Sequence, residues 1–142
     1  AANSFQVVYD DVNTIRVDGE VIVDWTKEFK FGGNVEFNSY NLDTQAEAWN
    51  LPMIKATLIT KYIRKKWNVG AEMFFASDRK DDLIIEDPYS IMRITNKSYF
   101  DININGLYNF NDKFSIFLNL NNILNSNYQE YTNFKVQGFQ VF

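Results

Sequence analysis

Adjacent carboxylates are the residues of this sequence whose types and spacing come nearest to catalytic or metal-binding chemistry. They occur at Asp10-Asp11, Asp81-Asp82 and Glu86-Asp87. Neighbouring side chains of an extended chain point to opposite faces, so such a pair cannot act jointly as general acid and base. The segment around Asp81 offers oxygen ligands for a hard cation such as Ca²⁺, but it lacks the ligand spacing of a calcium loop. We therefore expect a solvated loop there, and neither a metal site nor a cofactor.

The overall composition removes further classes of chemistry. The chain has no histidine and no cysteine, which excludes Ser-His and Cys-His nucleophiles, zinc sites built on His or Cys, and disulfides. Its 14 Lys and Arg residues against 18 Asp and Glu residues give a net charge of −4. A phosphate backbone is held by basic residues, so nucleic acid is not an expected partner. The composition therefore predicts a protein that is not an enzyme.

Period-two alternation of apolar and polar residues marks the structural elements. Phe31 and Val35, for example, alternate with Asn34 and Glu36. The pattern is clear in 14–26, 30–40, 53–62, 67–75, 99–110 and 114–122, and less regular in 5–9 and 135–142. No helical crossover separates these segments, so neighbouring strands are expected to be antiparallel. The sequence therefore predicts an all-β fold, an antiparallel up-and-down meander of about eight strands.

Strand lengths and connection lengths both point to a membrane. Most of the segments have about 9–12 residues, which exceeds the ~5–6 typical of soluble sheets and matches the ~9–11 of a membrane-spanning strand. Tight connections at 26–29, 63–66 and 111–113 alternate with long ones at 41–52, 78–97 and 123–134. In a meander this alternation places all tight turns at one end, as in outer-membrane barrels. We therefore expect a segment of a larger transmembrane β-barrel.

Aromatic residues make up 17% of the chain, and many of them flank the tight turns. Such rings are expected to form a girdle at one membrane boundary, or alternatively to cover the edge of a soluble core. The girdle residues are Trp25, Phe29, Tyr62, Trp67, Phe110 and Phe114. The residues expected to face lipid are Phe31, Val35, Phe37, Leu58, Val69, Met73, Phe75, Ile102, Ile104, Ile116, Leu118 and Leu120. Alternation alone does not separate a lipid-facing barrel from a soluble sandwich, since each has one polar face per strand.

Most of the sequence from about residue 14 onward resembles a known family. FLNLNNILNSNYQEYTNFKVQGF (117–139) is similar to the C-terminal strands of TonB-dependent outer-membrane receptors. The matching residues are Asn122, Leu124, Asn125, Tyr128, Gly138 and Phe139, and EAWNLP (47–52) and WNVGAEMFFASDRK (67–80) resemble upstream hairpins of such receptors. Asn tolerates left-handed backbone and can end a strand without Gly or Pro, while Tyr128 is expected to lay its ring on the rim with its hydroxyl in water.

The resemblance implies a function, a location and partners. It implies a bacterial outer-membrane receptor that imports a nutrient, sugar or metal chelate, in contact with lipid and with TonB, and in some forms with a surface lipoprotein. TonB would act through a part not in this sequence. The aromatic residues expected to contact the ligand are Trp49, Tyr89, Tyr128 and Tyr131, although the same rings could instead pack the long connections against one another.

The same resemblance implies a 22-stranded barrel with an N-terminal plug, whereas 142 residues have room for about eight strands. We therefore expect residues 1–142 to form a single barrel segment without a plug domain, the C-terminal third of a receptor. A complete eight-stranded barrel is the alternative architecture. A soluble all-β ligand-binding module and a small structural outer-membrane barrel are the alternative functions.

Overall fold

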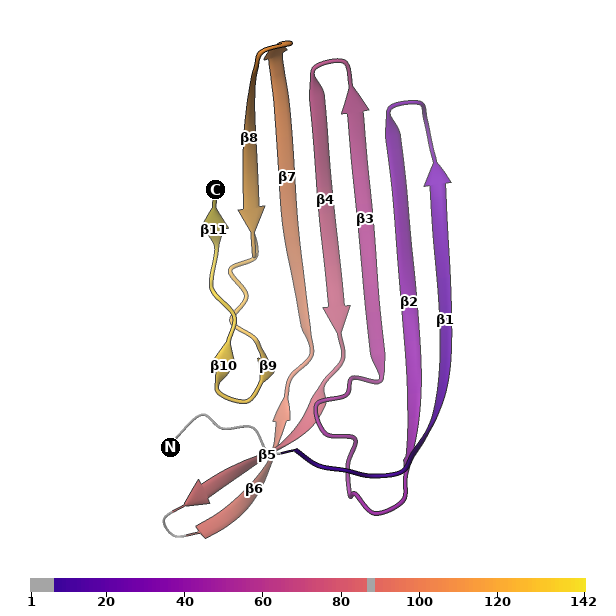
Figure 1. The fold of residues 1–142 in the computed structure, drawn as a ribbon, viewed down its shortest axis with the longest axis vertical. Coiled ribbons are helices and arrows are strands. Elements are labelled where there is room, and N and C mark those ends of the chain that lie inside the picture. The colour runs from indigo at the N-terminus through magenta and orange to yellow at the C-terminus, as the bar shows by residue number, and fades with distance from the viewer. Residues whose placement is uncertain (1–6, 87–88) are drawn as a thin grey trace.

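The computed structural model describes residues 7–86 and 89–142, and within this part the chain folds into eleven strands. Seven of them form one antiparallel sheet in the order β1-β2-β3-β4-β7-β8-β11 (Figure 1). Their bounds are β1 Val12–Asp24, β2 Phe29–Leu42, β3 Ile54–Arg64, β4 Trp67–Ala76, β7 Tyr99–Asn111, β8 Phe114–Asn121 and β11 Gln140–Val141. The predicted all-β antiparallel meander is confirmed.

Two hairpins lie outside this sheet. Strands β5 (Arg79–Glu86) and β6 (Tyr89–Asn96) pair along their whole length, and β9 (Gln129–Tyr131) pairs with β10 (Phe134–Lys135). The prediction of a plain loop over 78–97 was therefore wrong. The segment holds two short runs of β-branched residues on either side of Asp87-Pro88, a typical turn dipeptide, and this local pattern favours a hairpin.

The two ends of the sheet differ as predicted. The connections 25–28, 65–66 and 112–113 are tight and lie together at the upper end of Figure 1, whereas the long connections and both hairpins lie at the lower end. The Thr26 hydroxyl accepts the Phe29 amide at 2.9 Å, and the Asn111 side chain accepts the amides of Lys113 and Phe114 at 2.9 and 3.0 Å. Side-chain caps of this kind close a turn without glycine or proline.

The register sorts the side chains onto two faces. Gly33, Leu58, Met73 and Ile102 are successive cross-strand partners, so they share one face, and the twelve residues predicted to face lipid all lie on it. The opposite face carries mostly charged and amide side chains, with Ile22 among the exceptions, as the alternation predicted. Val35, Leu58, Ile116 and Leu118 are each between 40% and 56% exposed, so nothing within the described chain covers the apolar face.

The described residues have almost no apolar interior. Ala76 is their only buried hydrophobic side chain; the buried polar residues are Asn38, Arg79, Asn96, Asp101 and Asn122, and Pro52 and Gly70 are buried as well. None of the described residues belongs to a helix that is long and apolar enough to span a membrane. A single layer of strands with one uncovered apolar face is the arrangement of a barrel wall. In a soluble sandwich a second sheet would cover that face.

The sheet is open at both edges. Strand β1 pairs only with β2, and β11 pairs only with β8, among the residues that the structure describes. The described residues therefore form an open sheet and not the closed eight-stranded barrel of the alternative. The predicted strand at 5–9 is also not found: residues Val7–Tyr9 form no strand, and the rest of that segment lies outside the described residues.

Candidate functional site

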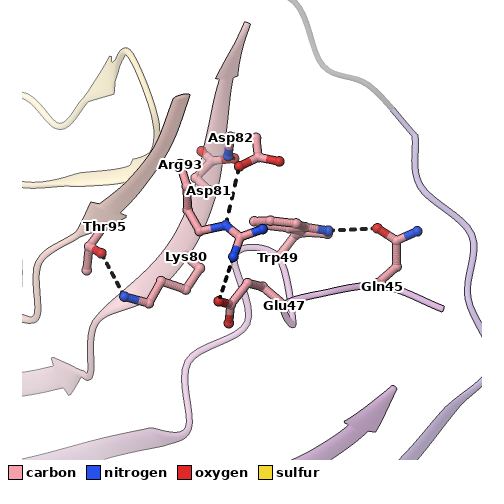
Figure 2. A network of polar contacts seen from close by, with 8 residues as sticks. All are labelled: Gln45, Glu47, Trp49, Lys80, Asp81, Asp82, Arg93 and Thr95. Atoms are coloured by element: carbon pink, nitrogen blue, oxygen red, sulfur yellow. Dashed lines mark hydrogen bonds and ion pairs between the residues drawn. The ribbon is translucent and has the colours of Figure 1, made fainter. Parts of the chain in front are cut away.

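The long-connection end holds the densest cluster of polar and aromatic side chains. Arg93 of β6 is central to it: its guanidinium carbon lies 5.2 Å from the Trp49 ring centroid, and its nitrogens lie 3.3 Å from Glu47 Oε1 and 3.9 Å from Asp82 Oδ1 (Figure 2). The indole Nε1 of Trp49 donates to Gln45 Oε1 at 2.9 Å. Arg93 thus joins the β2–β3 connection to the β5–β6 hairpin through a cation–π contact and two ion pairs.

A second set of contacts joins the β5–β6 hairpin to the β9–β10 hairpin. The Asp81 carboxylate accepts the Thr132 amide at 3.1 Å and also accepts the Thr132 hydroxyl. Arg79 Nη2 donates to the Gln129 carbonyl at 2.8 Å, and Asn96 Nδ2 donates to Thr132 Oγ1 at 3.3 Å. The carboxylates predicted to be a solvated loop therefore hold structural partners instead, and Asp81 and Asp82 contact different segments.

The third set of contacts anchors this end to the sheet. The rings of Tyr99 and Tyr128 stack with centroids 4.0 Å apart and planes 6° apart, and the Arg79 guanidinium lies 5.0 Å from the Tyr99 centroid. The Tyr128 hydroxyl donates to Asp101 Oδ2 at 3.2 Å, so it is not left in water as expected. Burial, and then the negative charge of the buried Asp101, raises the pKa of Tyr128 well above its ordinary value, so the hydroxyl stays protonated and keeps donating.

The start of the β2–β3 connection has an anchor of its own. The Asp10 carboxylate accepts the Thr44 hydroxyl at 2.7 Å and the amides of Thr44 and Gln45 at 3.0 Å each. These donors favour the charged form, and the Gln45 amide contributes most to holding the pKa of Asp10 below its usual range. Asp10 of the pair Asp10-Asp11 thus closes a loop with its carboxylate.

The residues of the family motif join the end of β8 to the segment before β11. Asn122 is buried and has a φ of 47°; its side-chain amide donates to the carbonyls of Ser126 and Gln137 at 2.9 Å each. Asn125 has a φ of 49° and accepts the Phe139 amide at 3.0 Å. A Cβ on Gly138 would lie 2.7 Å from Asn125 Oδ1, which explains the glycine. The predicted left-handed conformation of the motif asparagines is confirmed.

The rings predicted as ligand contacts meet different surroundings. Trp49 and Tyr128 pack connections against one another, the alternative that the sequence left open for them. Tyr131 is 47% exposed, and the side chain of Tyr89 lies outside the described residues. Sequence reasoning missed Arg79, Asp81 and Arg93 as organising residues, because their partners come from distant connections. The described residues hold no group of His, Cys, Asp and Glu that could bind a metal ion.

The rings predicted as a girdle gather at the opposite end. Trp67 contacts Tyr108 at 4.4 Å between centroids, Tyr108 contacts Phe110 at 4.7 Å, and Phe110 contacts Phe114 at 5.2 Å. Trp25 lies 6.1 Å from Phe31 in the same way. These rings occupy the apolar face beside the tight turns. Tyr108 belongs to this ring belt, although it was not among the residues predicted for the girdle.

A hollow of about 650 Å³ also lies at the tight-turn end. Its lining includes Lys27 and Glu28 of the first turn, Arg64 and Lys65 of the second, and Ile63. None of the four rings predicted to contact a ligand lines it.

Solved structures share this architecture. The ferripyoverdine receptor of the outer membrane of Pseudomonas aeruginosa, bound to ferripyoverdine, matches 93% of this chain at a TM-score of 0.80 and 15% identity. The chain has the fold of a TonB-dependent receptor barrel. The receptor FpvA of strain PAO1 bound to pyoverdine matches 92% at a TM-score of 0.79, and the FpvAI–pyocin S2 complex matches 93% at 0.80, both at 15% identity.

The match to the receptor barrel covers only part of those proteins. The chain spans about a fifth of their length, between 18% and 20% in these three structures. No family model matches the sequence, and no curated protein matches it. The predicted resemblance to TonB-dependent receptors is therefore confirmed at the level of the fold, and the receptor barrel provides the frame in which its faces and ends are interpreted.

Proposed function

We propose that this chain is a wall and rim segment of a bacterial outer-membrane receptor that takes up a nutrient or metal chelate with energy relayed by TonB. The observation that carries the proposal is the uncovered apolar face, bounded by a belt of rings at the tight-turn end. Soluble monomers rarely expose apolar patches beyond a few hundred Å², whereas a barrel wall turns such a face to lipid.

The proposal assigns a role to each part of the chain. The apolar face contacts acyl chains, the rings lie at one membrane boundary, and the long connections with their polar cluster lie outside the cell. The solved receptors bind pyoverdines, which supports a small chelate or nutrient as the ligand class. TonB, and a surface lipoprotein if the receptor has one, would be contacted through other parts of the receptor. No observation favours the soluble ligand-binding module, because its apolar face would have to be covered.

The three tryptophans allow a direct test. Trp25 and Trp67 belong to the ring belt and are 71% and 51% exposed, whereas Trp49 lies in the long-connection cluster. Each is kept in turn while the other two are replaced by Phe, and the protein is placed in vesicles with lipids brominated at different depths. We expect strong quenching of Trp25 and Trp67 by bromine near the head groups and much weaker quenching of Trp49.

Equal quenching of all three tryptophans, or none at any depth, would contradict the membrane assignment. Trp49 is the internal control, since it belongs to the same chain but lies in the β2–β3 connection at the opposite end of the sheet. The transport part is tested separately with cells that make the intact protein. Uptake of a labelled iron chelate that continues at the same rate without TonB would contradict it.

A further inference from the structure

The tight turn between β3 and β4 carries three consecutive cations. Arg64 ends β3, Lys65 and Lys66 form the turn, and all three are exposed. Within the described residues the ion pairs involve Arg16, Lys30 and Arg93, so none neutralises this turn. A chain with a net charge of −4 thus carries three adjacent cations without an ion pair at one point, and Glu28 is the carboxylate that shares a hollow with Arg64 and Lys65.

The first of these cations lies on the apolar face. Arg64 is the cross-strand partner of Trp67, and one of its nitrogens lies 3.5 Å from the Tyr62 hydroxyl. Tyr62 and Trp67 belong to the ring belt on the same face. A long cationic side chain at the end of an apolar strand, just beyond interfacial rings, reaches the head-group layer while its stem stays against hydrocarbon.

The neighbouring turn brings one cation and one carboxylate close to this one. The Ile63 amide donates to the Glu28 carbonyl at 2.7 Å, which holds the β1–β2 turn against the end of β3. Lys27 and Glu28 of that turn line the same hollow as Arg64 and Lys65, and this hollow lies on the polar face, where Ile63 and Asn68 also line it. At this corner Arg64 therefore sets a cation beside the interfacial rings of the apolar face, with the two turn lysines next to it, and this combination suits an anion that carries hydrocarbon.

We propose that the Arg64-Lys65-Lys66 turn binds the phosphate of an anionic phospholipid in the leaflet that faces the tight-turn end. The inference rests on the proposed function, since it requires the apolar face to lie in a membrane. Arg64 would donate in a planar fork to the phosphate oxygens, and the two lysines would act as point charges. The lipid chains would lie against Tyr62 and Trp67.

Energy transfer to labelled lipids tests this site. Trp67 is kept as the donor with Trp25→Phe and Trp49→Phe, and the acceptor is a dansyl group on phosphatidylglycerol or on phosphatidylcholine at trace level in phosphatidylcholine vesicles. We expect transfer to dansyl-phosphatidylglycerol to exceed transfer to dansyl-phosphatidylcholine by at least about threefold, since each basic residue near an anionic surface strengthens association several-fold. High salt should reduce this ratio.

The variant Arg64→Gln/Lys65→Gln/Lys66→Gln should bring the ratio close to one. The matched control Lys55→Gln/Lys97→Gln/Lys135→Gln removes the same charge toward the long connections and should leave the ratio unchanged. Equal energy transfer to both lipids from the protein with its Arg64-Lys65-Lys66 turn unaltered would overturn this inference and leave the membrane assignment standing. No transfer to either lipid would overturn both.

A soluble phosphate ligand is the remaining source of the same chemistry. Inorganic phosphate at matched ionic strength should lower the lipid preference no more than chloride does. A markedly stronger effect of phosphate would assign the turn to a soluble phosphate compound and overturn the lipid proposal.

Discussion

At the scale of single residues, Asn122 connects the end of β8 to two other segments. Its amide group bonds Ser126 twice and Gln137 once, and its own backbone amide donates to Asn103 at 3.0 Å. The side chain is buried away from water, so without these bonds each of its polar groups would have no hydrogen-bond partner. The motif asparagine therefore acts as a structural bracket, and its left-handed backbone directs the chain away from the sheet.

Replacement of this bracket has a predictable cost. Asn122→Ala removes three side-chain hydrogen bonds and places an alanine at a φ of 47°, so we expect a loss of about 2–4 kcal/mol in unfolding free energy. Denaturant unfolding of the protein in lipid vesicles measures it. The control is Asn127→Ala, an exposed amide five residues further on, which should change stability by less than about 0.5 kcal/mol. Equal losses of stability in the two variants would contradict the structural role of the Asn122 side chain.

At the scale of elements, the β5–β6 hairpin stands away from the sheet and is fastened on both sides. Arg93 and the backbone bond from Asn50 to the Lys80 carbonyl, 2.8 Å, hold the β2–β3 connection to it. Asp81 and Arg79 hold the β9–β10 hairpin to it. The three long connections are therefore linked through this one hairpin, and a change in one of them is passed to the others through named contacts.

Arg93→Ala should loosen one of these links and leave the sheet intact. It removes the contact with the Trp49 ring and two partly exposed ion pairs, which together are worth about 1 kcal/mol. Hydrogen exchange of the Asn50 amide should therefore become about fivefold faster, with β7 and β8 unchanged. Arg16→Ala, which breaks exposed ion pairs on the polar face of β1, should leave Asn50 unaffected. Unaltered exchange in Arg93→Ala would show that the backbone bond alone holds the connection.

At the scale of the whole molecule, the proposed function places the two sides of one strand in different environments. Leu58 lies midway along β3 on the apolar face, and its sequence neighbour Thr57 points to the polar face. In a membrane, Leu58→Arg buries a charge near the bilayer centre and should cost about 2–4 kcal/mol, while Thr57→Arg should be nearly neutral. Guanidinium unfolding in lipid vesicles compares the two. Similar costs at both positions would argue against lipid on the apolar face.

The sequence by itself determined the strands of the sheet, its tight turns and the sorting of residues such as Leu58 and Met73 onto one face. These features depend on period-two alternation and on turn chemistry, which are properties of a few neighbouring residues. Even the motif asparagines were readable, because left-handed backbone is a local preference of Asn.

Only the tertiary structure decided what the aromatic rings and charges of the long connections do. Arg93 and Glu47 are 46 residues apart, and Tyr128 and Asp101 are 27 apart, so no local pattern pairs them. The structure also decided between two meanings of the alternation. A sandwich and a barrel wall have the same alternation, and they differ only in whether a second layer covers the apolar face. Here the described chain forms one layer, and that face stays open.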